Sequence, residues 1–280
     1  MNYSIDQLIR EANKLPPIPQ AAQKTLALMR NSEANAANLA RVISTDQVLV
    51  ARVLRWANSA YFGTVNQIIT VQQAIVVLGM DRLQELIMSY SLSDHLNRSV
   101  SGYDLQHGEL WQHALGTAIG AKLISKQCRL HFDEEAYFAG LLCDIGKLIF
   151  EKLLHETNIW QTEGEQVSFL DLERANFGID HASLGAEIAR RWQLPENLVD
   201  AIAYHHEPWA ARSHPVLVAV VHVADSIMMI LGIGIGIDGL RYTLDKEALR
   251  RLGMVEDDLL YLVDHVAEQL TEAKELFSPG

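Results

Sequence analysis

The sequence predicts an all-α protein, a multi-helix bundle preceded by an N-terminal helical lobe. Apolar residues recur at three- and four-residue intervals over most of the chain, which is the spacing that one face of a helix requires. Helix-start signals precede several of these stretches: Ser4 with Gln7 and Thr70 with Gln73 are capping boxes, and Asp46 is a suitable N-cap. Apolar residues make up 49% of the 280 residues, which is enough for a large core.

Residues 1–95 are expected to form the N-terminal lobe, and residues 96–108 a polar link. The segment Leu15-Pro16-Pro17-Ile18-Pro19 ends the first helix, because proline lacks a backbone donor. The lobe holds no cluster of titratable residues, so we interpret it as a packing or interaction module. Its later helices are expected at residues 20–30, at 38–43, after Asp46 with Leu49, Val53, Trp56 and Ala60 on one stripe, at 74–78 before Gly79, and around Leu83, Leu86, Ile87 and Tyr90.

A second helical set, the helical core, is expected at residues 109–231. Residues 232–280 follow as a glycine-rich loop and C-terminal helices, the latter from about residue 245 to residue 277. Between Gly232 and Gly239, glycine recurs at nearly every second position and breaks any helix. This loop has neither the ending of a P-loop nor the preceding strand of a dinucleotide fingerprint.

Composition excludes several classes of partner. The net charge of −12 argues against nucleic acid, because binding there depends on basic residues that neutralise phosphates. The two cysteines, Cys128 and Cys143, have no CxxC spacing and suit a reducing cytoplasm. The N-terminus lacks the regions of a signal peptide. The longest apolar run, residues 216–237, contains His222 and Asp225, so it is interpreted as a buried helix and not as a membrane span. We therefore expect a cytoplasmic protein.

Asp144 is the most informative residue, since it lies inside the otherwise apolar run from Gly140 to Lys147. A buried carboxylate is costly unless it is paired or bound to a metal. At helical spacing, this run places Gly140, Cys143, Asp144 and Lys147 on one face of a helix. This face is expected to carry functional side chains, whereas the neighbouring face is expected to pack against the rest of the protein.

Residue types that bind metals recur through the helical core, on separate expected helices. Glu109 and His113 are four residues apart, so both side chains can reach one point. Asp225 is a second carboxylate in a run with little reason to hold one. Imidazole and carboxylate together suit divalent first-row metals. The candidate metal ligands are Glu109, His113, Cys143, Asp144, His181, His205, His206 and Asp225.

Each of these residues also has a purely structural interpretation. A lone histidine such as His113 on an apolar face is usually a core residue. His205 then faces a helix dipole, Cys143 is a small buried hydrophobe, and Lys147 is a solvated charge near a helix end. Asp225 is harder to explain without a partner. Because five expected helices each supply a ligand type, we favour a metal site.

Taken in order, these residues resemble the HD superfamily of metal-dependent phosphohydrolases. The family pattern is a histidine, a His-Asp doublet followed by Ile-Gly-Lys, later histidines and a final aspartate. Cys143 replaces the histidine of the doublet, and a thiolate is itself a competent metal ligand. Glu109 resembles the extra carboxylate of some HD-GYP phosphodiesterases, but no Gly-Tyr-Pro loop follows Glu207, which argues against cyclic dinucleotide hydrolysis. The matching positions are His113, Asp144, Gly146, Lys147, His181, His205, His206 and Asp225.

The N-terminal lobe is similar to the HDOD family, the HD-related output domain. Three segments carry this resemblance: LPPIP at residues 15–19, ANSAYFG at 57–63 and QAIVVLG at 73–79. It covers about residues 5–231 and implies an all-helical, HD-like bundle in a bacterial signalling protein. Many members have lost HD ligands and have no assigned activity, whereas most of the ligand set is present in this chain.

The sequence leaves three functions open. The favoured one is a signal-transduction or regulatory output protein with a retained metal site. The alternative is a metal-dependent phosphohydrolase, acting on a phosphomonoester or a nucleotide phosphodiester through one or two ions. In that reading Asp144 bridges the ions, Lys147 neutralises phosphate charge, and His205 binds a second ion or protonates the leaving group. The third is a redox or metal sensor centred on Cys143.

The resemblance implies a divalent transition metal (Fe, Mn, Zn or Ni), as one or two ions. The expected partner is a regulatory protein or a small phosphorylated ligand, and a homodimer is compatible with the sequence. Neither nucleic acid nor a membrane is expected to bind.

Overall fold

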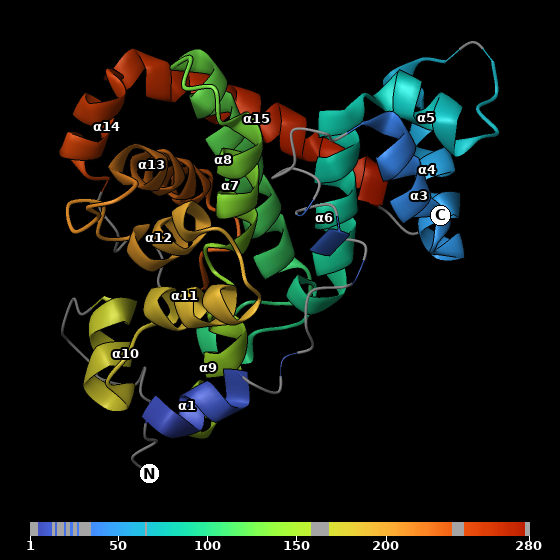
Figure 1. Cartoon of the computed structure of the whole chain (residues 1–280). Helices are drawn as coiled ribbons and strands as arrows, with labels where there is room; N and C mark the ends of the chain where they lie inside the picture. The colour runs from blue at the N-terminus through green and yellow to red at the C-terminus, as the bar shows by residue number, and fades with distance from the viewer. Residues whose placement is uncertain are drawn as a thin grey trace. The chain divides into compact units, whose positions relative to one another are not determined.

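The computed structural model describes residues 5–12, 15, 20, 23–24, 27, 35–64, 66–157, 168–236 and 244–277 (Figure 1). These residues form helices, and no β-sheet is present among them, so the all-α prediction is confirmed. Ser4, residues 16–19, most of the helix expected at 20–30 and the end of the glycine-rich loop lie outside the described residues. In the part of the chain that the structure describes, no helix combines the length and the apolar character needed to cross a bilayer.

The chain divides into two compact units. The smaller unit comprises Pro17–Asp94 and Thr271–Gly280, and the larger unit comprises Met1–Pro16 and His95–Leu270. This division differs from the one expected from the sequence, in which residues 1–95 form one lobe and the chain's end belongs with the C-terminal helices. Charge is divided unevenly: the smaller unit has seven Lys and Arg against seven Asp and Glu, so the whole net charge of −12 lies on the larger unit.

Local capping accounts for the helices of the smaller unit. The Asp46 side chain accepts from the N–H groups of Val48 and Leu49 at 2.9 and 3.1 Å, and Thr70 with Gln73 forms the expected capping box. These helices are α3 (Ala36–Ser44), α4 (Gln47–Ala57), η1 (Ala60–Phe62), α5 (Val71–Leu78) and most of α6 (Met80–Leu96).

Trp56 lies at the centre of the smaller unit's apolar core. Its side chain is buried together with Leu49 and Val53 of the same helix, and its indole N–H donates to the Leu276 carbonyl at 3.1 Å. Ala60 was expected to extend this stripe, but α4 ends at Ala57 and Ala60 is exposed in η1.

The larger unit is built around α7, which packs against α8 and α13 (Figure 1). The helices α7 and α13 approach closely at Gly116, where a Cβ would lie 2.3 Å from the Met228 sulfur. The unit contains α1 (Ile5–Ala12), η2 (Ser101–Tyr103), α7 (Glu109–Gln127), α8 (Asp133–Leu142), α9 (Lys147–Thr157), α10 (Phe169–Phe177), α11 (His181–Arg191), α12 (Glu196–Tyr204), α13 (Pro215–Leu231), α14 (Lys246–Leu252) and most of α15 (Glu256–Phe277).

Asp144 lies in a turn and not on a continuous helix. The helix expected through residues 140–147 is interrupted, since α8 ends at Leu142 and α9 begins at Lys147. Gly146 explains the break: a Cβ there would lie 2.0 Å from the backbone oxygen of His181, so the turn approaches the start of α11 closely. The turn thereby brings Asp144 and His181 into one place.

Candidate metal site

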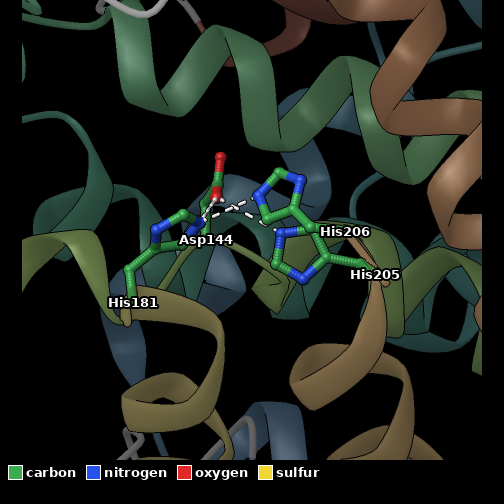
Figure 2. Close-up of side chains that lie close together, drawn as sticks. All are labelled: Asp144, His181, His205 and His206. Carbon is green, nitrogen blue, oxygen red and sulfur yellow. Dashed lines mark hydrogen bonds and ion pairs between the residues drawn. The ribbon is translucent and has the colours of Figure 1, made fainter. Parts of the chain in front are cut away.

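Asp144 is surrounded by histidine rings from separate helices. Its carboxylate oxygens lie 3.6 Å from Nε2 of His113, 3.4 Å from Nε2 of His181 and 3.7 Å from Nε2 of His205. Figure 2 shows the rings of His181, His205 and His206 beside the Asp144 carboxylate. All five side chains are buried, and His206 is the most accessible of them at 9%. The prediction that residues far apart in sequence meet at one polar pocket is consistent with this geometry.

Backbone carbonyls orient two of these rings. Nδ1 of His113 lies 2.8 Å from the Ile233 oxygen, and Nδ1 of His205 lies 2.8 Å from the Ile202 oxygen. A carbonyl accepts a hydrogen bond, so Nδ1 carries a proton in both rings and Nε2 faces the carboxylates, where it can bind a metal once it holds no proton. The glycine-rich loop therefore has a role that the sequence did not reveal, because it supplies the Ile233 carbonyl.

Glu173 orients His181 in the same way and was missed from the sequence. Its buried carboxylate accepts from the His181 backbone N–H at 2.7 Å, lies 2.9 Å from Nδ1 of that ring, and accepts from the Tyr103 hydroxyl. Carboxylate–histidine pairs of this kind commonly support metal-binding imidazoles. A signal was present: Glu173 is four residues from both Phe169 and Phe177, on the buried face of α10.

The candidate ligands fall into two groups that share Asp144. One contains Asp144, His181, His205 and His206, and the other contains His113, Asp144 and Asp225. In the second group, Nε2 of His113 lies 2.8 Å from a carboxylate oxygen of Asp225. In the first, the Nε2 atoms of His181 and His206 are 3.0 Å apart.

Burial and neighbouring charges shift the pKa values of three histidines in the cluster. Although burial opposes this shift, the Glu173 charge, the nearby Asp144 carboxylate and the hydrogen bond to Glu173 raise the pKa of His181 to about 10. The hydrogen bond to Asp225 and the charge of that carboxylate raise the pKa of His113, although burial opposes this rise. By contrast, burial and the neighbouring rings hold the pKa of His206 well below its ordinary value.

Lys147 pairs with Asp144 directly. Its ammonium lies 2.8 Å from a carboxylate oxygen of Asp144 and 5.7 Å from the centre of the Tyr103 ring. Burial opposes ionisation of Asp144, but the Lys147 charge and the neighbouring rings of His181 and His205 hold its pKa well below the ordinary value. Asp144 is therefore a carboxylate at neutral pH.

Two predicted ligands are not brought into either group. Glu109 is the first residue of α7, and its carboxylate accepts from the Gln106 backbone N–H at 2.7 Å. Cys143 is fully buried, and its thiol lies 3.2 Å from the Gly140 oxygen. Burial and the nearby carboxylates raise the pKa of Cys143 well above its ordinary value, so it is a thiol. Spacing alone placed Cys143 on the Asp144 face of a helix and Glu109 within reach of the same point as His113.

The residues present fit a divalent metal. One oxygen of Asp144 and Nε2 of His205 are buried and have no hydrogen-bond partner among the described residues. Such groups are costly to bury unless something pairs with them. Both are electron-pair donors that face one another at 3.7 Å, so a cation between them would satisfy both.

Comparison with known proteins agrees with this fold. A protein of uncharacterised function from Treponema pallidum (strain Nichols) is 29% identical over 233 residues, which cover 79% of this chain and 44% of that protein. The chain therefore spans less than half the length of this relative.

Two crystal structures resemble the whole chain. An HDOD domain protein from Geobacter sulfurreducens is 26% identical, with a TM-score of 0.78 and coverage of 98% of this chain and 100% of the other. A candidate phosphohydrolase from Shewanella amazonensis SB2B is 25% identical, with a TM-score of 0.73 and coverage of 97% and 98%. The sequence model of the HDOD domain matches residues 15–208. The chain belongs to the HDOD domain family.

Proposed function

We propose that this chain is a signalling protein of the HDOD family that binds a divalent transition metal in its histidine–aspartate cluster. The observation that carries the proposal is the convergence of electron-pair donors on Asp144, one of whose oxygens has no partner. Fixed Nδ1 contacts turn the rings of His113, His181 and His205 so that Nε2 faces this carboxylate. Buried polar atoms arranged in this way favour a cation over an apolar core.

Mixed imidazole and carboxylate donors suit Fe, Mn, Zn or Ni. Asp144 belongs to both groups of ligands, which supports a carboxylate shared between two ions, although either group also suits one ion alone. The deep burial of the cluster, where no ligand is more than 9% exposed, favours a bound ion that stabilises or switches the protein over one that turns over a large substrate. We propose a regulatory protein as the partner of this switch.

Metal content tests the proposal directly. Purified protein, treated with chelator and reloaded, is expected to hold at least one equivalent of iron, manganese, zinc or nickel by elemental analysis. Asp144→Asn is expected to lose the ion, because the amide carries no charge and its nitrogen does not bind metal. Asp200→Asn is the matched control, since Asp200 pairs with His214 away from the cluster. A wild-type protein that retains no ion from any of these metals would disprove metal binding.

Hydrolysis of a phosphate ester is a second candidate, which Lys147 favours. A bound ion would supply Lewis acidity toward a phosphoryl oxygen and toward water. The Lys147 side chain is 11% exposed, and its ammonium would offset charge on a phosphate, while His205 would hold or donate a proton at Nε2. The likeness to the Shewanella candidate phosphohydrolase supports the same reading.

An aryl phosphate assay separates the two candidates. Metal-loaded wild-type protein is expected to release aryl alcohol under the second candidate, whereas Asp144→Ala is expected to be inactive and Lys147→Gln to be weakened. If the fully metal-loaded protein hydrolyses neither aryl phosphate monoesters nor diesters, the hydrolytic role is refuted and the regulatory role stands.

A further inference from the structure

Arg174 connects the two segments of chain that carry His181 and His206. It lies in α10, and its side chain is 40% exposed. Its Nε donates to a carboxylate oxygen of Asp180 at 2.6 Å, while Nη1 and Nη2 donate to the two oxygens of Glu207 at 2.9 and 2.7 Å. Because a guanidinium group is planar and rigid, these three bonds fix the two carboxylates relative to one another.

Both carboxylates adjoin a candidate ligand in sequence. Asp180 comes directly before His181, and its other oxygen caps the start of α11. Glu207 comes directly after His206, in the turn that follows α12. The guanidinium of Arg174 therefore ties the start of one helix to the end of another at the positions where the two imidazoles leave the backbone.

The spacing of these two rings matters for an ion. Their Nε2 atoms are 3.0 Å apart, and both rings lie beside the Asp144 carboxylate (Figure 2). Two nitrogens that each lie about 2.1 Å from one ion, at a right angle, are separated by about 3.0 Å. The rings of His181 and His206 thus already have the separation that two ligands at a right angle to one ion would have.

We propose that Arg174 is a positioning residue of the metal site, which holds His181 and His206 at the spacing for one ion. This inference rests on the proposed metal binding. The neighbouring residue, Glu173, fixes the His181 ring through Nδ1, so two consecutive residues of α10 hold the ring and the chain that carries it. Arg174 itself bonds to neither ring.

The test compares Co²⁺ binding by the full chain, with visible absorption as a report on the ligands. Arg174→Ala is expected to weaken binding about 10- to 100-fold and to change the absorption bands, as loss of a group that supports a ligand does. Glu207→Gln should act in the same direction, and adding it to Arg174→Ala should have little further effect because Arg174→Ala already removes the contact with Glu207. Arg190→Ala is the matched control: Arg190 lies on α11 and pairs with Glu187 away from the cluster.

A second readout needs no metal. Long-range ¹H–¹⁵N spectra of the metal-free protein report the protonation of each histidine ring, and Arg174→Ala is expected to shift the His181 and His206 signals while Arg190→Ala leaves them unchanged. If Co²⁺ binds Arg174→Ala and Glu207→Gln as tightly as wild type, or if Arg190→Ala weakens it equally, the positioning role is refuted. If wild type binds no Co²⁺, the proposed function fails, and the ring signals still decide whether Arg174 positions the two histidines.

Discussion

Raising the pH should tighten metal binding, because an ion and a proton compete for Nε2 of His181. The pKa of this ring is about 10 in the metal-free protein, so at pH 7 an incoming ion must displace a proton. That cost falls by about 1.4 kcal/mol for each pH unit until the pKa is reached. Between about pH 7.0 and 8.5, the dissociation constant is therefore expected to fall about 30-fold. His113, with a raised pKa, acts in the same direction, whereas His206 holds no proton to displace.

The assay is competition with a chelator of known pH dependence, combined with calorimetry in buffers of different ionisation enthalpy to count released protons. Glu173→Gln removes the charge that contributes most to the raised pKa, so this variant should show a flatter pH dependence over the same range. Glu187→Gln, an exposed change on α11, should retain the wild-type slope. Wild-type affinity that does not vary with pH, or binding that releases no proton, would show that His181 is not protonated before the ion arrives.

Four further predictions concern the parts around the site and the smaller unit. Cys143→Ala should leave metal affinity within about twofold while costing about 1 kcal/mol of stability, because its sulfur contacts the Gly140 oxygen and no ligand; a tenfold loss in chelator competition would make the thiol a ligand after all. Gly146→Ala should lower the free energy of unfolding in urea by about 3 kcal/mol or more, because the added Cβ would lie 2.0 Å from the His181 oxygen. The control Gly253→Ala has open space around the added Cβ but a φ of +68°, so it should lower the same free energy by about 1 kcal/mol. Equal losses for the two variants would contradict the close approach at Gly146. Thr70→Ala should lower the unfolding free energy by about 1 kcal/mol through loss of the capping box, and an unchanged urea midpoint would contradict it. The thermal stability of the metal-free protein should fall as the pH rises from about 6.5 to about 10. The raised pKa of His181 stabilises the folded state fully at pH values below the pKa of the unfolded chain, and this stabilisation is lost as the pH approaches the pKa of the folded state. A melting temperature that stays constant across this pH range would contradict the shift.

Local signals predicted the fold well. Asp46 and Thr70 begin helices in the structure as the sequence indicated, because a cap depends on residues two or three positions away. The same reasoning failed at residues 140–147, where spacing alone suggested a continuous helix. The break there depends on Gly146 meeting the His181 backbone, a contact between residues that are distant in sequence.

The candidate site was predicted less completely. Asp144 and Asp225 stood out because each interrupts an apolar run, and the structure places both in the cluster. Glu173 and Arg174 lie in a helix with other charged residues, so their sequence resembles a solvated face. The spacing of Glu173 from Phe169 and Phe177 gives the one hint of its burial, whereas the three hydrogen bonds of Arg174 come from tertiary packing, which sequence spacing does not specify.

The uneven division of charge gives the two units different ionic surroundings. All of the excess negative charge lies on the unit that contains the cluster, so that unit enriches divalent cations near its surface and depletes phosphate anions. Metal uptake should accordingly be fastest in dilute buffer and slow down as salt is added, while an anionic ligand should show the opposite trend. The smaller unit has no net charge, so it neither attracts nor repels ions in this way and can approach positively and negatively charged partners alike.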